Sequence, residues 1–250
     1  MSEKPMEQPV FKKGLKGVVA NETGLSDVRG EEGRLLYCGY EIEDLVDLCS
    51  YTEIIYLLLN KRLPNREELE GLQQRLRHDR ELPQPILDFF KTATKTARPM
   101  SALRTAVSML GMYDDRTKDP SQMKEIGLSL IAKMPVMAAY YYRICQGLDL
   151  PPIRTDLGEA EHFLWLLKGK EPDPAEAHIL DVAYILHADH GMSASTFASR
   201  VTASTLSDMY SSITTAIGTL KGPLHGGANE AVIEMLKEIG DEENVEAYVN

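Results

Sequence analysis

The sequence has little cysteine and no excess of positive charge. Its three cysteines, Cys38, Cys49 and Cys145, are odd in number and far apart, which argues against a disulfide framework or a zinc knuckle and predicts reduced thiols. The formal net charge of −11 at pH 7, with no local cluster of lysine and arginine, argues against a nucleic-acid partner. Any anionic substrate must therefore be held by a few well-placed basic groups.

Long hydrophobic runs are also absent. Apolar stretches such as residues 54–59 are far too short to span a bilayer, and residues 1–9 carry neither the apolar core of an export signal nor an arginine-rich organelle signal. We therefore expect a cytoplasmic protein with no membrane partner. With 43% hydrophobic and 26% charged residues, the chain has the composition of a globular protein. A chain of 250 residues removes roughly 70–75% of its surface from water on folding.

The residue pattern predicts an all-α fold after a short N-terminal β-hairpin. Two β-prone segments, residues 18–23 and 34–40, flank a turn-rich segment at 27–33. After them, apolar residues recur at helical spacing. The predicted helices cover residues 41–49, 54–59, 65–80, 86–96, 101–111, 122–146, 159–167, 175–190 and 193–220.

Two helix starts and one histidine have clear local signals. Ser50 with Glu53, and Asn65 with Glu68, have the spacing of a capping box, in which each side chain accepts a hydrogen bond from the other residue's backbone. His162 stands among apolar and aromatic residues, which predicts a core or edge histidine. These features concern the fold and carry no chemistry.

The most informative stretch is residues 220–230, between two helical patterns. Gly222 and Pro223 end the first helix, because glycine adopts the left-handed exit conformation and proline cannot continue the helical hydrogen bonds. His225 is therefore expected on a short turn before the next helix, whose dipole favours a neutral imidazole. A neutral ring can donate a hydrogen bond to a carbonyl oxygen that becomes an enolate. The alternative is a histidine satisfied by the carbonyls of a tight turn.

Two further histidines lie at the predicted end of helix 175–190. His187 and His190 are three residues apart and share a face. With Asp189 they could form part of a metal site, but no third histidine or cysteine occurs in a plausible motif, and we expect no metal. Alternatively, both rings interact with the C-terminal end of the helix dipole. The next segment, residues 193–220, has thirteen Ser or Thr among 28 residues and is predicted as one long central or dimer-interface helix.

These motifs closely resemble those of the citrate synthase family. The strongest resemblance is carried by Gly-Pro-Leu-His-Gly-Gly-Ala-Asn at residues 222–229 and by His-Ala-Asp-His at residues 187–190. It also extends through residues 17–23, 33–42 and 99–108. Motifs of this length and spacing are a specific signal.

The resemblance implies a transferase of the tricarboxylic acid cycle that condenses acetyl-CoA with oxaloacetate and water to give citrate and CoA, with no cofactor. His225 would stabilise the enol formed from the thioester, and His190 would hydrogen-bond oxaloacetate. His187 would contribute more weakly, by fixing local geometry. Ser193 stands where the family often has asparagine, so its contact with substrate would be altered or weakened.

The resemblance also implies a large helical domain at residues 1–224 and the beginning of a small domain at 225–250, in a homodimer of the short bacterial or archaeal type. The family pattern continues with a Gly-His-Arg segment, a catalytic aspartate and substrate-binding arginines, which residues up to Asn250 do not supply. We therefore expect an N-terminal portion that is inactive alone. Arg98 and Ser101 occupy positions where the family usually has a histidine and an acid, and neither is assigned a catalytic role.

Two alternative functions remain open. A 2-methylcitrate synthase would use propionyl-CoA instead of acetyl-CoA, and the sequence does not separate the two because acyl-chain selection depends on pocket residues that are largely absent. A protein of another class, a non-catalytic helical interaction protein, would use the small-residue helix at 193–220 for pairing.

Overall fold

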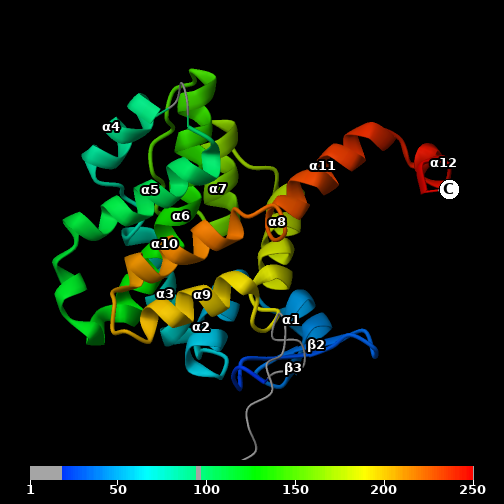
Figure 1. Cartoon of the computed structure of the whole chain (residues 1–250), viewed down its shortest axis with the longest axis horizontal. Helices are drawn as coiled ribbons and strands as arrows, with labels where there is room; N and C mark the ends of the chain where they lie inside the picture. Colours follow the sequence, from blue (N-terminus) through cyan, green and yellow to red (C-terminus); the bar gives the residue numbers. More distant parts are fainter. Residues whose placement is uncertain (1–18, 94–96, 250) are drawn as a thin grey trace, which may run out of the picture.

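The computed structural model describes residues 19–93 and 97–249 and confirms the all-α class (Figure 1). A small antiparallel sheet contains β1 (Ser26–Arg29), β2 (Arg34–Tyr37) and β3 (Tyr40–Glu41). The α-helices are α1 (Ile42–Leu48), α2 (Tyr51–Asn60), α3 (Arg66–His78), α4 (Gln84–Ala93), α5 (Pro99–Leu110), α6 (Met123–Gln146), α7 (Glu159–Lys168), α8 (Pro174–His187), α9 (Ala194–Ala203), α10 (Met209–Leu220), α11 (Gly227–Ile239) and α12 (Val245–Val249). Short 3-10 segments are η2 (Gly111–Tyr113), η3 (Asp115–Lys118), η4 (Pro120–Gln122) and η5 (Glu242–Asn244). None of the described helices is long and apolar enough to cross a membrane.

The N-terminal sheet differs from the predicted hairpin in its first strand. β1 begins at Ser26, which lies opposite Tyr37 of β2, and the connecting turn closes at Gly33 with a left-handed φ of 64°. The segment 27–33, predicted as a turn, supplies residues 27–29 of β1. The strand extends this far because a tight turn needs only a few residues between the strands that it joins. Residues 19–23 belong to no strand, and residue 18 of the predicted strand lies outside the described part of the chain, as do residues 94–96 of the helix predicted at 86–96.

The two predicted capping boxes are confirmed. The N–H of Glu68 donates to Asn65 Oδ1 at 2.9 Å, and the Glu68 carboxylate accepts from the Asn65 N–H at 2.9 Å. At α2, the Glu53 carboxylate accepts from the N–H of Ser50 at 2.7 Å and from its hydroxyl at 2.8 Å. A capping residue satisfies backbone groups that the first helical turn leaves free, which is why this local signal fixes where α2 and α3 begin.

The two largest of four apolar clusters in the described part of the chain hold most of its helices together. The larger joins α4, α5, α6 and α10 through buried residues Ile86, Phe90, Ala102, Ala106, Val107, Leu110, Ile126, Leu130, Met137, Tyr141, Tyr210 and Ile217. The second joins the sheet to α1, α2 and α8 through Tyr37, Ile42, Leu45, Ile54, Leu57 and Ile185. The C-terminal half of α8 therefore packs on the N-terminal sheet, although the two are about 150 residues apart in sequence.

The single helix predicted at 193–220 is wrong, because the structure has two helices there. α9 and α10 lie side by side and are joined by residues 204–208 (Figure 1). At the end of α9, the hydroxyl of Ser204 donates to the Val201 carbonyl at 2.7 Å, and Leu206 adopts a left-handed φ of 63°. Asp208 then caps α10 by accepting from the N–H of Ser211 at 2.9 Å. Short polar side chains that bond to nearby backbone thus end one helix and begin the next.

The helix predicted at 175–190 ends earlier than expected. α8 stops at His187, so His190 lies in the following turn rather than on the helix. Gly191 in that turn has a left-handed φ of 81°, a conformation that glycine adopts without strain. The predicted face shared by the two histidines is nevertheless retained in part, because their rings stack with centroids 6.4 Å apart and planes 15° apart.

The last helices leave the body of the fold. Figure 1 shows α11 leading away from the other helices towards the C-terminus. Val232, Ile233 and Leu236 on α11 are about half exposed. In contrast, α10 is covered by α5, α6 and α9.

His162 is confirmed as a core histidine, with only 2% of its surface exposed. The ring Nε2 accepts a hydrogen bond from the Arg154 N–H at 3.4 Å. Burial, followed by the charges of Arg80 and Arg154, lowers the pKa of His162 from 6.5 to about 3. The folded protein therefore keeps this ring neutral across a pH range in which the unfolded chain protonates it.

We expect stability to decline with acid because of this ring. As the pH falls from about 6.5 towards 3, the unfolded state binds a proton that the folded state does not, at a cost on the order of 3–5 kcal/mol over the whole range. Urea unfolding of His162→Gln between pH 7.5 and pH 4.5 should show a flatter decline than the wild type. His78→Gln is the control, because the His78 side chain is 88% exposed. An identical slope in wild type and His162→Gln would contradict this account.

Candidate active site

His225 lies where the sequence predicts it, on a turn between α10 and α11, but Gly222 does not have the predicted left-handed conformation and the C-cap of α10 is Lys221 in a right-handed one. Its backbone N–H donates to the Gly222 carbonyl at 3.0 Å, and the N–H of Gly226 donates to the Leu220 carbonyl at 2.9 Å. The turn needs glycine at position 226, because a Cβ there would lie 2.5 Å from the Leu220 carbonyl oxygen. The ring is half-buried and stands one residue before the N-cap of α11, in a backbone that local hydrogen bonds fix.

A short chain of hydroxyl groups holds the His225 ring. His225 Nε2 is 2.9 Å from Ser195 Oγ, on the first turn of α9. Ser195 Oγ is in turn 3.0 Å from the hydroxyl of Ser193, the N-cap of α9, which accepts from the Thr196 N–H at 3.3 Å. The structure therefore brings two of the predicted site residues, His225 and Ser193, together through Ser195, a residue that the sequence analysis missed.

This arrangement leaves one ring nitrogen available for a ligand. A neutral imidazole has one donor and one acceptor nitrogen. When the Ser195 hydroxyl donates to Nε2 of His225, Nδ1 carries the hydrogen and can donate it to a carbonyl or enol oxygen. The hydroxyl contact thus fixes the orientation of the ring, and with the hydroxyl as donor it matches the tautomer that the predicted chemistry needs.

His190 and His187 lie outside this chain of hydroxyls. His190 Nε2 is 2.5 Å from the Leu186 carbonyl oxygen, and His187 Nδ1 is 2.7 Å from the Ala183 carbonyl oxygen. Both side chains are exposed, so a ligand could displace either contact. Within the described residues, no group of three His, Cys, Asp or Glu side chains is arranged to hold a metal ion.

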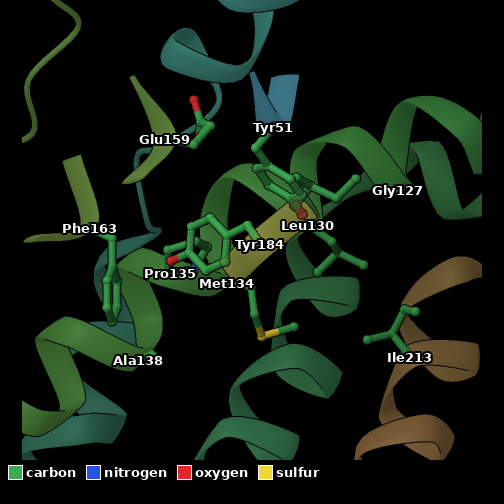
Figure 2. Close-up of a pocket in the computed structure, with 11 residues that line it drawn as sticks. Tyr51, Gly127, Leu130, Met134, Pro135, Ala138, Glu159, Phe163, Tyr184 and Ile213 are labelled. Atoms are coloured by element: carbon green, nitrogen blue, oxygen red, sulfur yellow. The ribbon is translucent and has the colours of Figure 1, made fainter. Parts of the chain in front are cut away.

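An apolar pocket of about 570 Å³ lies elsewhere, among α2, α6, α7, α8 and α10 (Figure 2). Tyr51, Tyr184 and Pro135 line it, and Ile213 of α10 faces it from the other side. Burial raises the pKa of Tyr51 to about 12, so this phenol stays protonated. The pocket's carboxylate, Glu159, is paired with a buried arginine. No predicted site residue lines this pocket, and its groups offer no free base or nucleophile.

The helical fold and the histidine on an interhelical turn define an all-α protein of the kind seen in solved citrate synthases. The crystal structure of citrate synthase from Pyrobaculum aerophilum matches with a TM-score of 0.87 and 41% identity, over 96% of this chain and 64% of that one. The citrate synthase of Thermoplasma acidophilum, solved as a ternary complex with carboxymethyl coenzyme A and oxaloacetate, matches with a TM-score of 0.87 and 31% identity, over 97% of this chain and 64% of that one.

The chain belongs to the citrate synthase family. The family model described as "Citrate synthase, C-terminal domain" matches residues 14–250. Citrate synthase 2 of Bacillus subtilis is 48% identical over 240 residues, and 2-methylcitrate synthase 2 of Corynebacterium glutamicum is 39% identical over 246 residues. The matches cover 95% and 96% of this chain and 64% of each relative, so the chain spans just under two thirds of their length. The roles of individual residues in the site stay predictions.

Proposed function

We propose that the chain carries part of the active site of a citrate synthase, which condenses acetyl-CoA with oxaloacetate and water to give citrate and CoA. Family membership supports the reaction class. The single observation that supports the site is His225, held in a glycine-rich turn with its Nε2 against Ser195 at 2.9 Å. A ring fixed in this way is preorganised to hydrogen-bond an oxygen whose negative charge grows during reaction.

In this proposal, a carboxylate base takes a proton from the thioester methyl group, and His225 donates a hydrogen bond to the enol oxygen that forms. The enol carbon then bonds to the ketone carbon of oxaloacetate, whose oxygen takes up a proton. Water finally cleaves the thioester and releases CoA. We assign neither the base nor the arginines for the two carboxylates to residues of this chain. No cofactor is needed, because acetyl-CoA is a substrate.

Among the other predicted residues, His190 is proposed to bind oxaloacetate, and His187 and Ser193 are proposed to have supporting roles. His190 has an exposed ring that would hydrogen-bond this substrate once its contact with the Leu186 carbonyl is released. His187 stacks against His190 and would support its orientation. Ser193, through Ser195, would influence the His225 ring more than the substrate itself.

The activity test compares the 250-residue chain with a completed chain. The completed chain joins residues 1–250 to the part of the Bacillus subtilis relative that lies C-terminal to the matched region. We expect citrate and free CoA, followed by mass spectrometry and thiol release, from the completed chain and none from the 250 residues alone. Citrate formation by the shorter chain would contradict its proposed dependence on further residues. A folded completed chain that consumes neither acetyl-CoA nor propionyl-CoA would contradict the proposed function.

A 2-methylcitrate synthase is the second candidate, and the 39% identity to the Corynebacterium glutamicum enzyme favours it. This reaction keeps the same enol chemistry and places one additional methyl group in the acyl pocket. One methyl group in an apolar pocket changes specificity by about 10- to 200-fold. The ratio of kcat/KM for acetyl-CoA and propionyl-CoA, measured on the protein from its source organism, decides between the two.

We also propose a homodimer whose interface includes α9 and its connection to α10. Phe197, Val201 and Leu206 leave large apolar side chains exposed on these segments, as expected for a face that a second copy covers. Analytical ultracentrifugation at micromolar concentration would detect a dimer. The projecting helices after His225 would begin a second domain.

The three free cysteines suit the reducing cytoplasm, and we propose a cytoplasmic location that cell fractionation would check.

A further inference from the structure

The turn that carries His190 is tied to the N-terminal sheet through Asp189. Asp189 Oδ1 accepts a hydrogen bond from the Ser26 hydroxyl at 2.5 Å and another from the Gly191 N–H at 2.7 Å. One carboxylate oxygen thus bridges a strand residue and the residue directly after His190. Ser26 lies 163 positions earlier in the chain, so this contact depends on the tertiary fold.

A second contact from the sheet reaches the same turn. Tyr37 is fully buried, and its hydroxyl donates to the Ile185 carbonyl at 3.0 Å while accepting from the Asp189 N–H at 3.2 Å. The hydroxyl therefore gives the Ile185 carbonyl a second hydrogen bond, besides the one from the Ala188 N–H, and satisfies the Asp189 N–H just beyond α8. Ser26 and Tyr37 lie directly opposite each other in the β1–β2 ladder. The two strands hold both the backbone and the side chain of Asp189.

We propose that Asp189, fixed by Ser26 and Tyr37, is a positioning residue that sets the backbone and hence the ring of His190 for its substrate. The role of His190 itself rests on the proposed function. Asp189 acts through one oxygen as an acceptor of two hydrogen bonds, so the position of this acceptor matters more than the negative charge. Asparagine offers the same acceptor oxygen, whereas alanine offers none.

The test compares Asp189→Asn and Asp189→Ala in the 250-residue chain, with Asp173→Ala as the matched control. Asp173 caps the opposite end of α8, accepting from the N–H groups of Ala175 and Glu176 at 2.9 and 3.2 Å. Its removal weakens the same helix by about 1 kcal/mol without touching the His190 turn. The readouts are amide hydrogen exchange at Gly191 and the ring NMR signals of His187 and His190.

We expect Asp189→Ala to speed exchange of the Gly191 amide by about tenfold and to shift both ring signals, because a net hydrogen-bond contribution of about 1.4 kcal/mol is lost. Asp189→Asn should stay close to the wild type, and Asp173→Ala should leave both readouts unchanged. If Asp189→Ala fails to fold, Tyr37→Phe should speed exchange of the Asp189 amide. The proposal would be overturned if exchange and ring signals are unchanged in Asp189→Ala, or in Tyr37→Phe where that variant replaces it. Equal losses in Asp189→Asn and Asp189→Ala would also overturn it.

Titrating oxaloacetate into the same samples separates the two hypotheses. A His190 ring signal that responds to oxaloacetate in the wild type and Asp189→Asn, but about tenfold more weakly in Asp189→Ala, supports positioning for this substrate. If the wild-type signal does not respond to oxaloacetate but the exchange results are as expected, the proposed substrate role of His190 is contradicted. The positioning of its turn by Asp189 is then still supported.

Discussion

Replacing Glu159 by alanine is expected to destabilise the fold by about 3–5 kcal/mol, a large part of the stability of a typical domain. The Arg80 side chain is completely buried, with Nη2 2.5 Å from Glu159 Oε1 and Nη1 2.6 Å from the Arg154 carbonyl oxygen. Burial lowers the pKa of Arg80 and Glu159 opposes this effect, which means that the carboxylate stabilises the guanidinium charge. Without Glu159, an uncompensated positive charge would remain in the core.

Urea unfolding at pH 7.5 measures this effect, with Glu176→Ala as the control. Glu176 pairs with Lys168 at 2.5 Å, but its side chain is 48% exposed, and exposed pairs contribute only about 0–1 kcal/mol. The double variant Arg80→Met with Glu159→Leu should recover much of the loss, since it removes both buried charges. If Glu159→Ala lowers the free energy of unfolding by less than about 1 kcal/mol, the buried pair does not make the expected contribution to stability.

The parts of the fold that the sequence predicts well are those fixed by near neighbours. The capping residues Ser50 and Asn65 and the turn around His225 depend on side chains within a few positions, so their chemistry can be read locally. The buried state of His162 follows from its apolar neighbours on a helix. In each case the physical cause lies in the same short segment as the residue concerned.

The features that the sequence does not predict depend on contacts between distant segments. Ser195 contacts His225, which lies 30 positions later in the sequence. In the sequence, Ser195 is only a serine near the start of a helix, two residues after the N-cap Ser193. The break between α9 and α10 requires Leu206 in a left-handed conformation, which its side chain gives no reason to expect. The link from Ser26 to Asp189 arises only when the sheet packs on α8.

Replacing His225 by alanine in the completed chain is expected to lower kcat by about 10²–10³-fold, the usual cost of removing one preorganised donor to a developing oxyanion. The KM for oxaloacetate should change much less, because the proposed contact is to the oxygen of the enol formed from the thioester. His78→Ala is the control, since its ring is 88% exposed on α3, a separate helix. Steady-state rates of citrate formation provide both constants.

Ser195→Ala decides whether the hydroxyl chain orients that ring. The variant keeps the imidazole of His225 but removes the contact at 2.9 Å to its Nε2. A wrongly oriented or wrongly protonated ring donates less well, so we expect a kcat loss of about tenfold, smaller than in His225→Ala. In the double variant, the loss should match that of His225→Ala alone, because a hydroxyl that acts only through the ring has no effect once the ring is gone. If the kcat losses of the two single variants add in the double variant, Ser195 has a contact of its own with substrate. If His225→Ala keeps the wild-type kcat, the imidazole has no role in the reaction.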